Sequence, residues 1–301
     1  MLRCCCSSRR HRTAQRNPGP SLSDHARARR DVRRSGSSVT AWTAMEVSPL
    51  RRRVLANPAM RTILSVWAWF LLGVVVIIDL PLVAIVWVVT APFDKGRYWP
   101  GFVFRRLCVV HQWLNPLWQF RTTGLKIRDP RRPYVVVSNH ESFADMFLIS
   151  HLPWEMKWMS KETFFKFPLI GWLMHMSADI KLIRGSKQSI VSAMRGAKDR
   201  LDKRVSVMIF PEGTRTRDGS LGEFKDGAFR LAIENQVPIL PLAVVGTREA
   251  MPKGDWRFGI TSAEVRVLDP IETTGLTKDD IGDLRNRTRS VIEAAIAEMK
   301  A

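Results

Sequence analysis

Cysteine is scarce in this sequence, and its few cysteines are poorly placed for cross-linking or metal binding. Of the 4 Cys among 301 residues, Cys4, Cys5 and Cys6 are consecutive and Cys108 stands alone. This number excludes a disulfide-stabilised scaffold, and this spacing excludes a CxxC-type metal site. A G-x-S-x-G motif is also absent, so the chain lacks the serine nucleophile elbow of the α/β-hydrolases.

Acidic residues are outnumbered by basic ones, 28 Asp and Glu against 47 Lys and Arg, which gives a formal net charge of +19. Hydrophobic residues make up 46% of the chain, which excludes a wholly disordered protein. The basic excess is strongest in residues 1–44, which contain ten Arg, two Asp and no Lys. We therefore predict a disordered, Arg-rich segment over residues 1–50. Two interpretations of it remain, a transit peptide or a translated leader upstream of a start at Met45.

A long apolar run occupies residues 62–93 and is interrupted at its centre by Asp79-Leu80-Pro81. It exceeds the roughly 20 residues that one membrane span needs. Two interpretations remain, a single tilted, Pro-kinked span or an interfacial helical hairpin that turns at Asp79–Pro81. Basic residues flank both ends, at 51–53 and 95–106, which favours the hairpin with both ends on the cytoplasmic side. We predict that residues 51–118 form membrane-associated helices and hold the active site at the cytoplasmic side of an inner, cytoplasmic membrane.

Strand-like and helix-like patterns alternate through residues 119–301. Strands are predicted at 134–138, 156–159, 179–183, 205–210 and 239–245, with one or two edge strands in 256–268. Helices are predicted at 144–150, 186–201, 226–235 and 278–300, the second of them capped by Ser186. This alternation predicts an α/β domain whose mixed, largely parallel sheet is flanked by helices. Ligands of such sheets gather in the loops that follow the strands.

The first chemical motif runs from Asn139 to Asp145, directly after the strand predicted at 134–138. On one helix, His140 and Asp145 would lie about 140° apart around the axis. They can meet only if His140 precedes a helix and Asp145 lies in its first turn, because helical side chains lean towards the N-terminus. That arrangement makes a His–Asp dyad, in which the carboxylate orients the imidazole and His140 acts as general base on a substrate hydroxyl.

The second motif is Phe210-Pro211-Glu212-Gly213-Thr214-Arg215, at the end of the strand predicted at 205–210. Gly213 permits close approach of the backbone to a ligand. Arg215 offers two parallel donors to a phosphate group. The motif suits an anion-binding turn, although such a sequence on its own is more often an ordinary surface turn.

Together the two motifs, about 70 residues apart, resemble the glycerophospholipid acyltransferase family, of the 1-acylglycerol-3-phosphate acyltransferase type. The resemblance extends over roughly residues 115–250, and the upstream membrane helices are similar too. The four sequence blocks of the family correspond to residues 139–145, 181–185, 210–215 and 237–241. A basic segment between the first two blocks contains Lys161.

The resemblance implies a reaction and a set of site residues. An acyl thioester, acyl-CoA or acyl carrier protein, would donate its chain to the sn-2 hydroxyl of lysophosphatidic acid and give phosphatidic acid. Neither a metal nor another cofactor is needed, and no covalent acyl-enzyme is expected. His140 and Asp145 would be catalytic, and Glu212 would orient the glycerol or brace an arginine. The remaining substrate-binding residues, most of them for the phosphate, would be Lys161, Arg184, Gly213, Thr214 and Arg215.

Other functions remain open at this point. The same chemistry suits a different acceptor, such as glycerol 3-phosphate or another lysophospholipid. A lipid-binding scaffold of the same fold is a non-enzymatic alternative, and thioester hydrolysis is a third. The basic excess fits an anionic membrane surface, and we expect membrane lipid rather than nucleic acid as a partner.

Overall fold

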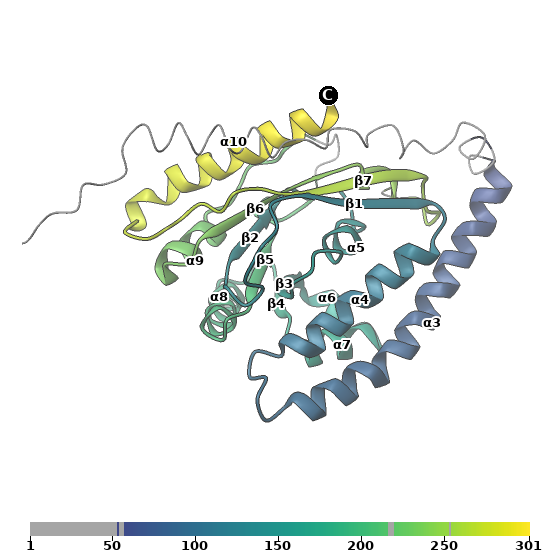
Figure 1. Cartoon of the computed structure of the whole chain (residues 1–301), viewed down its shortest axis with the longest axis horizontal. Coiled ribbons are helices and arrows are strands. Elements are labelled where there is room, and N and C mark those ends of the chain that lie inside the picture. The colour runs from purple at the N-terminus through teal and green to yellow at the C-terminus, as the bar shows by residue number, and fades with distance from the viewer. Residues whose placement is uncertain (1–52, 54–56, 216–219, 253) are drawn as a thin grey trace, which may run out of the picture. The chain divides into compact units, whose positions relative to one another are not determined.

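The computed structural model describes residues 53, 57–215, 220–252 and 254–301. The predictions for residues 1–50, including a start at Met45, lie outside the described residues. A sheet of seven strands has helices on both faces (Figure 1). The predicted α/β architecture is therefore confirmed.

The strands follow the order β1-β7-β6-β2-β5-β3-β4 across the sheet. In chain order they are β1 (Trp118–Gly124), β2 (Val135–Ser138), β3 (Met156–Lys161), β4 (Ile180–Leu182), β5 (Ser206–Ile209), β6 (Ile239–Val245) and β7 (Thr261–Val267). Neighbouring strands are parallel except for β6 and β7, so the sheet is mixed and largely parallel. The prediction of an edge position for residues 256–268 is wrong, because β1 pairs with the outer side of β7.

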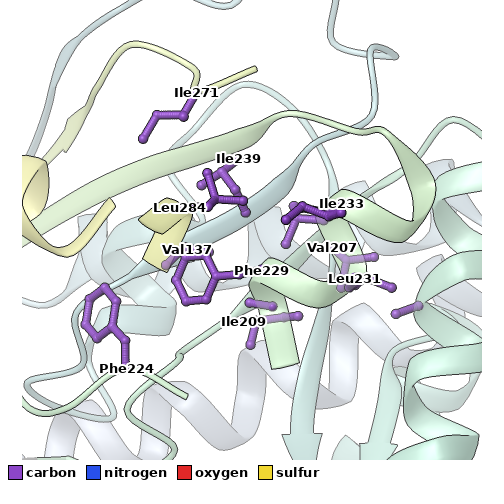
Figure 2. Packing of buried hydrophobic residues seen from close by; sticks show 14 of the residues in the cluster. Val137, Val207, Ile209, Phe224, Phe229, Leu231, Ile233, Ile239, Ile271 and Leu284 are labelled. Atoms are coloured by element: carbon purple, nitrogen blue, oxygen red, sulfur yellow. The ribbon is translucent and has the colours of Figure 1, made fainter. Parts of the chain in front are cut away.

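Three helices cover one face of the sheet: α8 (Lys187–Asp202), α9 (Gly227–Asn235) and α10 (Ile281–Lys300). Figure 2 shows their core, in which Phe229 and Leu284 pack beside Val137 and Ile239. The short helix α5 (Asp145–Ile149) packs on the other face with Val136. Val136 and Val137 are both fully buried and point to opposite faces, as successive strand residues must. Strand β2 is thus buried on both sides and holds the loop that follows it in place.

The long apolar run forms one continuous helix, α3 (Pro58–Thr90), with Pro81 inside it. The predicted turn at Asp79–Pro81 is therefore wrong. The apolar side chains of Val76 and Val83, before and after the proline, pack against a second helix, α4 (Tyr98–Leu114), and this packing outweighs the helix-breaking tendency of proline. A helical hairpin does exist, but its turn lies between α3 and α4 (Figure 1).

Helix α3 lies against the α/β domain instead of leaving it. Near its start, Arg61 Nε donates to the Phe258 carbonyl oxygen at 2.8 Å and Trp69 Nε1 to that of Trp256 at 2.9 Å. Further along, it packs on α4 and α7 (Ile170–Met176). In the described part of the chain, α3 alone is long and apolar enough to cross a membrane by length and composition. Its outward side exposes large apolar side chains, including Ile63, Phe70, Ile77, Ile85 and Val88.

A cluster of buried charges joins the hairpin to the sheet. The side chains of Glu155 and Lys157 are fully buried, and Lys157 Nζ donates to Glu155 Oε1 at 2.9 Å and to the Arg97 carbonyl oxygen at 2.6 Å. Arg105 of α4 donates to Asp179, which also accepts from a backbone amide of β3. Burial raises the pKa of the Glu155 carboxyl and lowers that of the Lys157 ammonium. The cluster fixes the hairpin against β3, the strand that leads to the proposed site.

Candidate active site

The His140 and Asp145 side chains meet at the end of β2. His140 lies in the loop after this strand, and Asp145 is the first residue of α5. His140 Nδ1 and Asp145 Oδ2 are 2.7 Å apart, within hydrogen-bonding distance. The Asp145 side chain is fully buried and that of His140 is 18% exposed. His140 thus precedes the helix and Asp145 lies in its first turn, the arrangement in which two residues at this spacing can meet.

The Asp145 carboxylate is held by several other donors. Its Oδ2 atom also accepts from the backbone amides of Glu141 at 2.9 Å and Ser142 at 3.1 Å. Its Oδ1 atom accepts from the hydroxyl of Thr247. These bonds use both carboxylate oxygens and so restrict rotation of the carboxyl group that contacts His140.

The imidazole of His140 is fixed on further sides. Its ring stacks on Phe210, with centroids 4.0 Å apart and an interplanar angle of 19°. Its backbone amide donates to Glu212 Oε1 at 2.8 Å. A neutral imidazole that donates through Nδ1 to Asp145 carries its lone pair on Nε2. The Nε2 atom is therefore available to accept a proton.

Glu212 joins the two motif loops. Its Oε1 atom binds the His140 amide, and its Oε2 atom accepts from the Gly222 amide at 3.0 Å. Burial raises the pKa of the Glu212 carboxyl, and these hydrogen bonds partly oppose the rise. The structure thus places Glu212 as a brace of the His140 loop, a contact that the sequence did not predict. Its expected contact with glycerol or with an arginine stays a prediction.

A cavity of about 530 Å³ opens beside His140. Its described lining contains three cationic side chains and no Asp or Glu. Aromatic side chains form another part of the wall. The predicted residues that the cavity brings together are His140, Lys161, Arg184, Gly213, Thr214 and Arg215. The apolar lining includes Phe143, Trp158, Phe164 and Phe210. A cationic and partly apolar cavity suits an anionic, amphiphilic ligand.

Gly213 makes the turn of the second motif. Its φ of +69° lies in the left-handed region, which favours glycine. Its amide donates to the Phe210 carbonyl oxygen at 3.0 Å and closes the turn. A Cβ atom here would lie 3.0 Å from Lys225 Nζ. The turn directs Thr214 and Arg215 to the cavity wall.

Two residues at the site were not predicted from the sequence. Asn139 bridges the loop to β6, since its side chain donates to the Val244 carbonyl oxygen and accepts from the Val244 amide, both at 2.8 Å. Thr247 follows β6 and reaches Asp145. Asn139 stands next to His140 in the motif, which is a signal that could have identified it. The sequence around Thr247 carries no comparable signal.

The chain resembles known proteins both in sequence and in fold. A family model described as Acyltransferase matches residues 119–245. The 1-acyl-sn-glycerol-3-phosphate acyltransferase alpha of Homo sapiens is 34% identical over 199 residues, which are 65% of this chain and 70% of the human protein. The chain belongs to this acyltransferase family.

The chain also resembles a plant protein in sequence and a bacterial protein in fold. A chloroplastic 1-acyl-sn-glycerol-3-phosphate acyltransferase of Arabidopsis thaliana is 39% identical over 156 residues, 52% of this chain and 44% of the plant protein. The chain thus spans less than half of the length of such plant relatives. The crystal structure of the acyltransferase PlsC from Thermotoga maritima has the same fold, with a TM-score of 0.65 and 23% identity over 81% of this chain and 97% of that one.

The matched family region contains both motif loops, and therefore His140, Asp145, Glu212 and Arg215. It ends two residues before Thr247.

Proposed function

We propose that this acyltransferase transfers a fatty acyl group from an acyl thioester to the sn-2 hydroxyl of 1-acylglycerol 3-phosphate, giving phosphatidic acid. One observation carries the proposal: the His140–Asp145 dyad borders a cavity that also holds Lys161, Arg184 and Arg215. The donor is acyl-CoA or an acyl carrier protein. The reaction needs neither a metal nor another cofactor.

The dyad supports the following chemistry. His140 Nε2 takes the proton of the acceptor hydroxyl as the oxygen attacks the thioester carbonyl carbon. Asp145 stabilises the imidazolium that forms. When the tetrahedral intermediate collapses, the carbon–sulfur bond breaks and the thiolate leaves. The imidazolium returns its proton to the sulfur, so the products are the ester and the free thiol.

The cationic wall of the cavity is proposed to bind the acceptor phosphate. Arginine suits this task because its guanidinium donates two parallel hydrogen bonds to a phosphate. We expect Arg215→Ala to raise the KM for lysophosphatidic acid by about tenfold, as a charged hydrogen bond is lost. Steady-state kinetics check this. Arg230→Ala, an exposed residue of α9 outside the cavity lining, is the matched control and is expected to leave KM unchanged.

An acceptor panel tests the proposed function. Purified protein is supplied with one acyl thioester and, separately, with lysophosphatidic acid, glycerol 3-phosphate and lysophosphatidylcholine. We expect the highest kcat/KM with lysophosphatidic acid. A higher value with another acceptor would support the same chemistry on that acceptor, and fatty acid release without any acceptor would indicate a hydrolase. Binding without turnover would indicate a lipid-binding scaffold.

We further propose that α3 and α4 attach the protein to the cytoplasmic side of an inner, cytoplasmic membrane. The exposed apolar side of α3 and its contacts with the α/β domain at Arg61 and Trp69 favour a helix lying in the interface. An anionic membrane surface attracts basic residues close to it by ~1 kcal/mol each. Attachment in this position would bring the cavity near its lipid acceptor.

A further inference from the structure

The second oxygen of the Asp145 carboxylate has a partner that follows β6. Thr247 begins a short 3-10 helix, Thr247–Glu249, and its hydroxyl donates to Asp145 Oδ1. Both side chains are fully buried. Thr247 does not belong to the described cavity lining, so its hydroxyl acts on the carboxylate and not on a ligand.

The backbone around Thr247 fixes this hydroxyl in place. Gly246 has a φ of +92°, and a Cβ atom there would lie 2.3 Å from the Ser262 carbonyl oxygen. The hydroxyl of Thr261 donates to the Gly246 carbonyl oxygen at 2.5 Å, and the Gly246 amide donates to Glu141 Oε2 at 3.1 Å. The turn is therefore anchored both to β7 and to the loop that carries His140.

Glu141 offers the Thr247 hydroxyl a second acceptor. Its Oε2 atom lies 3.3 Å from Thr247 Oγ1 and also accepts from Gly246. A hydroxyl has one proton and donates to one oxygen at a time. The contact with Asp145 is the shorter of the two, so the Thr247 hydroxyl donates its proton to Asp145 Oδ1.

We propose that Thr247 is a positioning residue for the His140 base, acting through Asp145; this inference rests on the proposed function. Oδ2 binds His140 Nδ1 together with the amides of Glu141 and Ser142. Without a donor at Oδ1, the buried carboxylate has an unpaired oxygen, and its free energy falls if the group turns towards another hydrogen-bond donor. Rotation about the Cβ–Cγ bond moves Oδ2 away from Nδ1, and the imidazole loses its orientation.

The test compares three variants with the wild-type protein. Thr247→Val removes the hydroxyl at nearly constant volume, and Thr247→Ser keeps it. Thr273→Val is the matched control, because Thr273 is also fully buried and donates to a backbone carbonyl, that of Val237 at 3.0 Å. Acyl transfer to lysophosphatidic acid and thermal unfolding are measured for each, with His140→Ala as the inactive reference.

We expect Thr247→Val to lower kcat by about 10- to 100-fold, as a hydrogen bond to a charged group is lost. The KM for lysophosphatidic acid should stay within about twofold, because only the transition state loses stabilisation. Thr247→Ser and Thr273→Val should retain nearly wild-type kcat. Equal losses in both Val variants, or a Ser variant as slow as Thr247→Val, overturn the inference. If Thr247→Val is fully active while His140→Ala is inactive, the role of Thr247 is overturned and the proposed function stands. If the wild-type protein transfers no acyl group, the proposed function is overturned as well.

Discussion

The His140→Ala variant is expected to lose about 10²- to 10⁴-fold in kcat, the usual contribution of a general base. The acceptor hydroxyl is a poor nucleophile until its proton is taken, and Nε2 of His140 is the group placed to take it. Substrate binding should persist, since the cationic wall of the cavity remains intact. Steady-state kinetics with lysophosphatidic acid and an acyl thioester measure the effect.

A second histidine provides the control for this prediction. His175 lies at the end of α7, is exposed, and is absent from the described cavity lining. His175→Ala should therefore keep wild-type kcat. If His140→Ala and His175→Ala are equally active and both are folded by circular dichroism, His140 is not the base.

The Glu155→Leu variant is expected to lower the free energy of unfolding by about 3–5 kcal/mol, because it leaves a buried charge without its partner. Lys157 is fully buried, and Glu155 is its carboxylate partner at 2.9 Å. The remaining ammonium must then lose its proton or draw water into the contact between α4 and β3. Denaturant unfolding in a mild detergent, followed by tryptophan fluorescence, measures the loss.

A double variant separates the charge effect from packing. Glu155→Leu combined with Lys157→Met removes both charges and should recover most of the lost stability, since an apolar pair often replaces a buried ion pair at no cost. Glu162→Gln, which breaks the partly exposed ion pair with Lys166, should cost less than about 1 kcal/mol. A double variant as unstable as Glu155→Leu would show that Lys157 is not the charge that Glu155 stabilises, and would point instead to Arg105, whose Nε lies 3.9 Å from Glu155 Oε2.

The buried strands of the sheet were predictable because their residues are mostly apolar, as burial on both faces requires. Val135, Val136 and Val137 form an uninterrupted apolar run, as expected for a strand covered on both faces. Strand β1 was missed because its sequence WQFRTTG is half polar. Two of its polar side chains find their hydrogen-bond partner far away in the sequence, since Arg121 and Thr123 both donate to Glu264 of β7.

The same distinction between local and distant contacts applies to the site. The His140–Asp145 contact spans five residues, so local geometry predicts it once His140 precedes the helix and Asp145 lies in its first turn. The Glu212 brace and the Thr247 contact connect segments 72 and 102 residues apart. The helix and strand periodicities of a sequence carry no information about pairs so far apart. The prediction of a turn at Asp79–Pro81 was wrong for a related reason. Residues distant in the sequence pack against this helix and outweigh the local helix-breaking effect of Pro81.

The most direct test of His140 as the base follows thiol release from an acyl thioester, with and without lysophosphatidic acid, in the wild-type protein and in His140→Ala. The account predicts that the wild-type protein releases thiol only when the acceptor is present, in equal amount to the phosphatidic acid formed. His140→Ala should show neither product above the background rate. Rapid thiol release without acceptor, or phosphatidic acid formed by His140→Ala at the wild-type rate, would contradict the account.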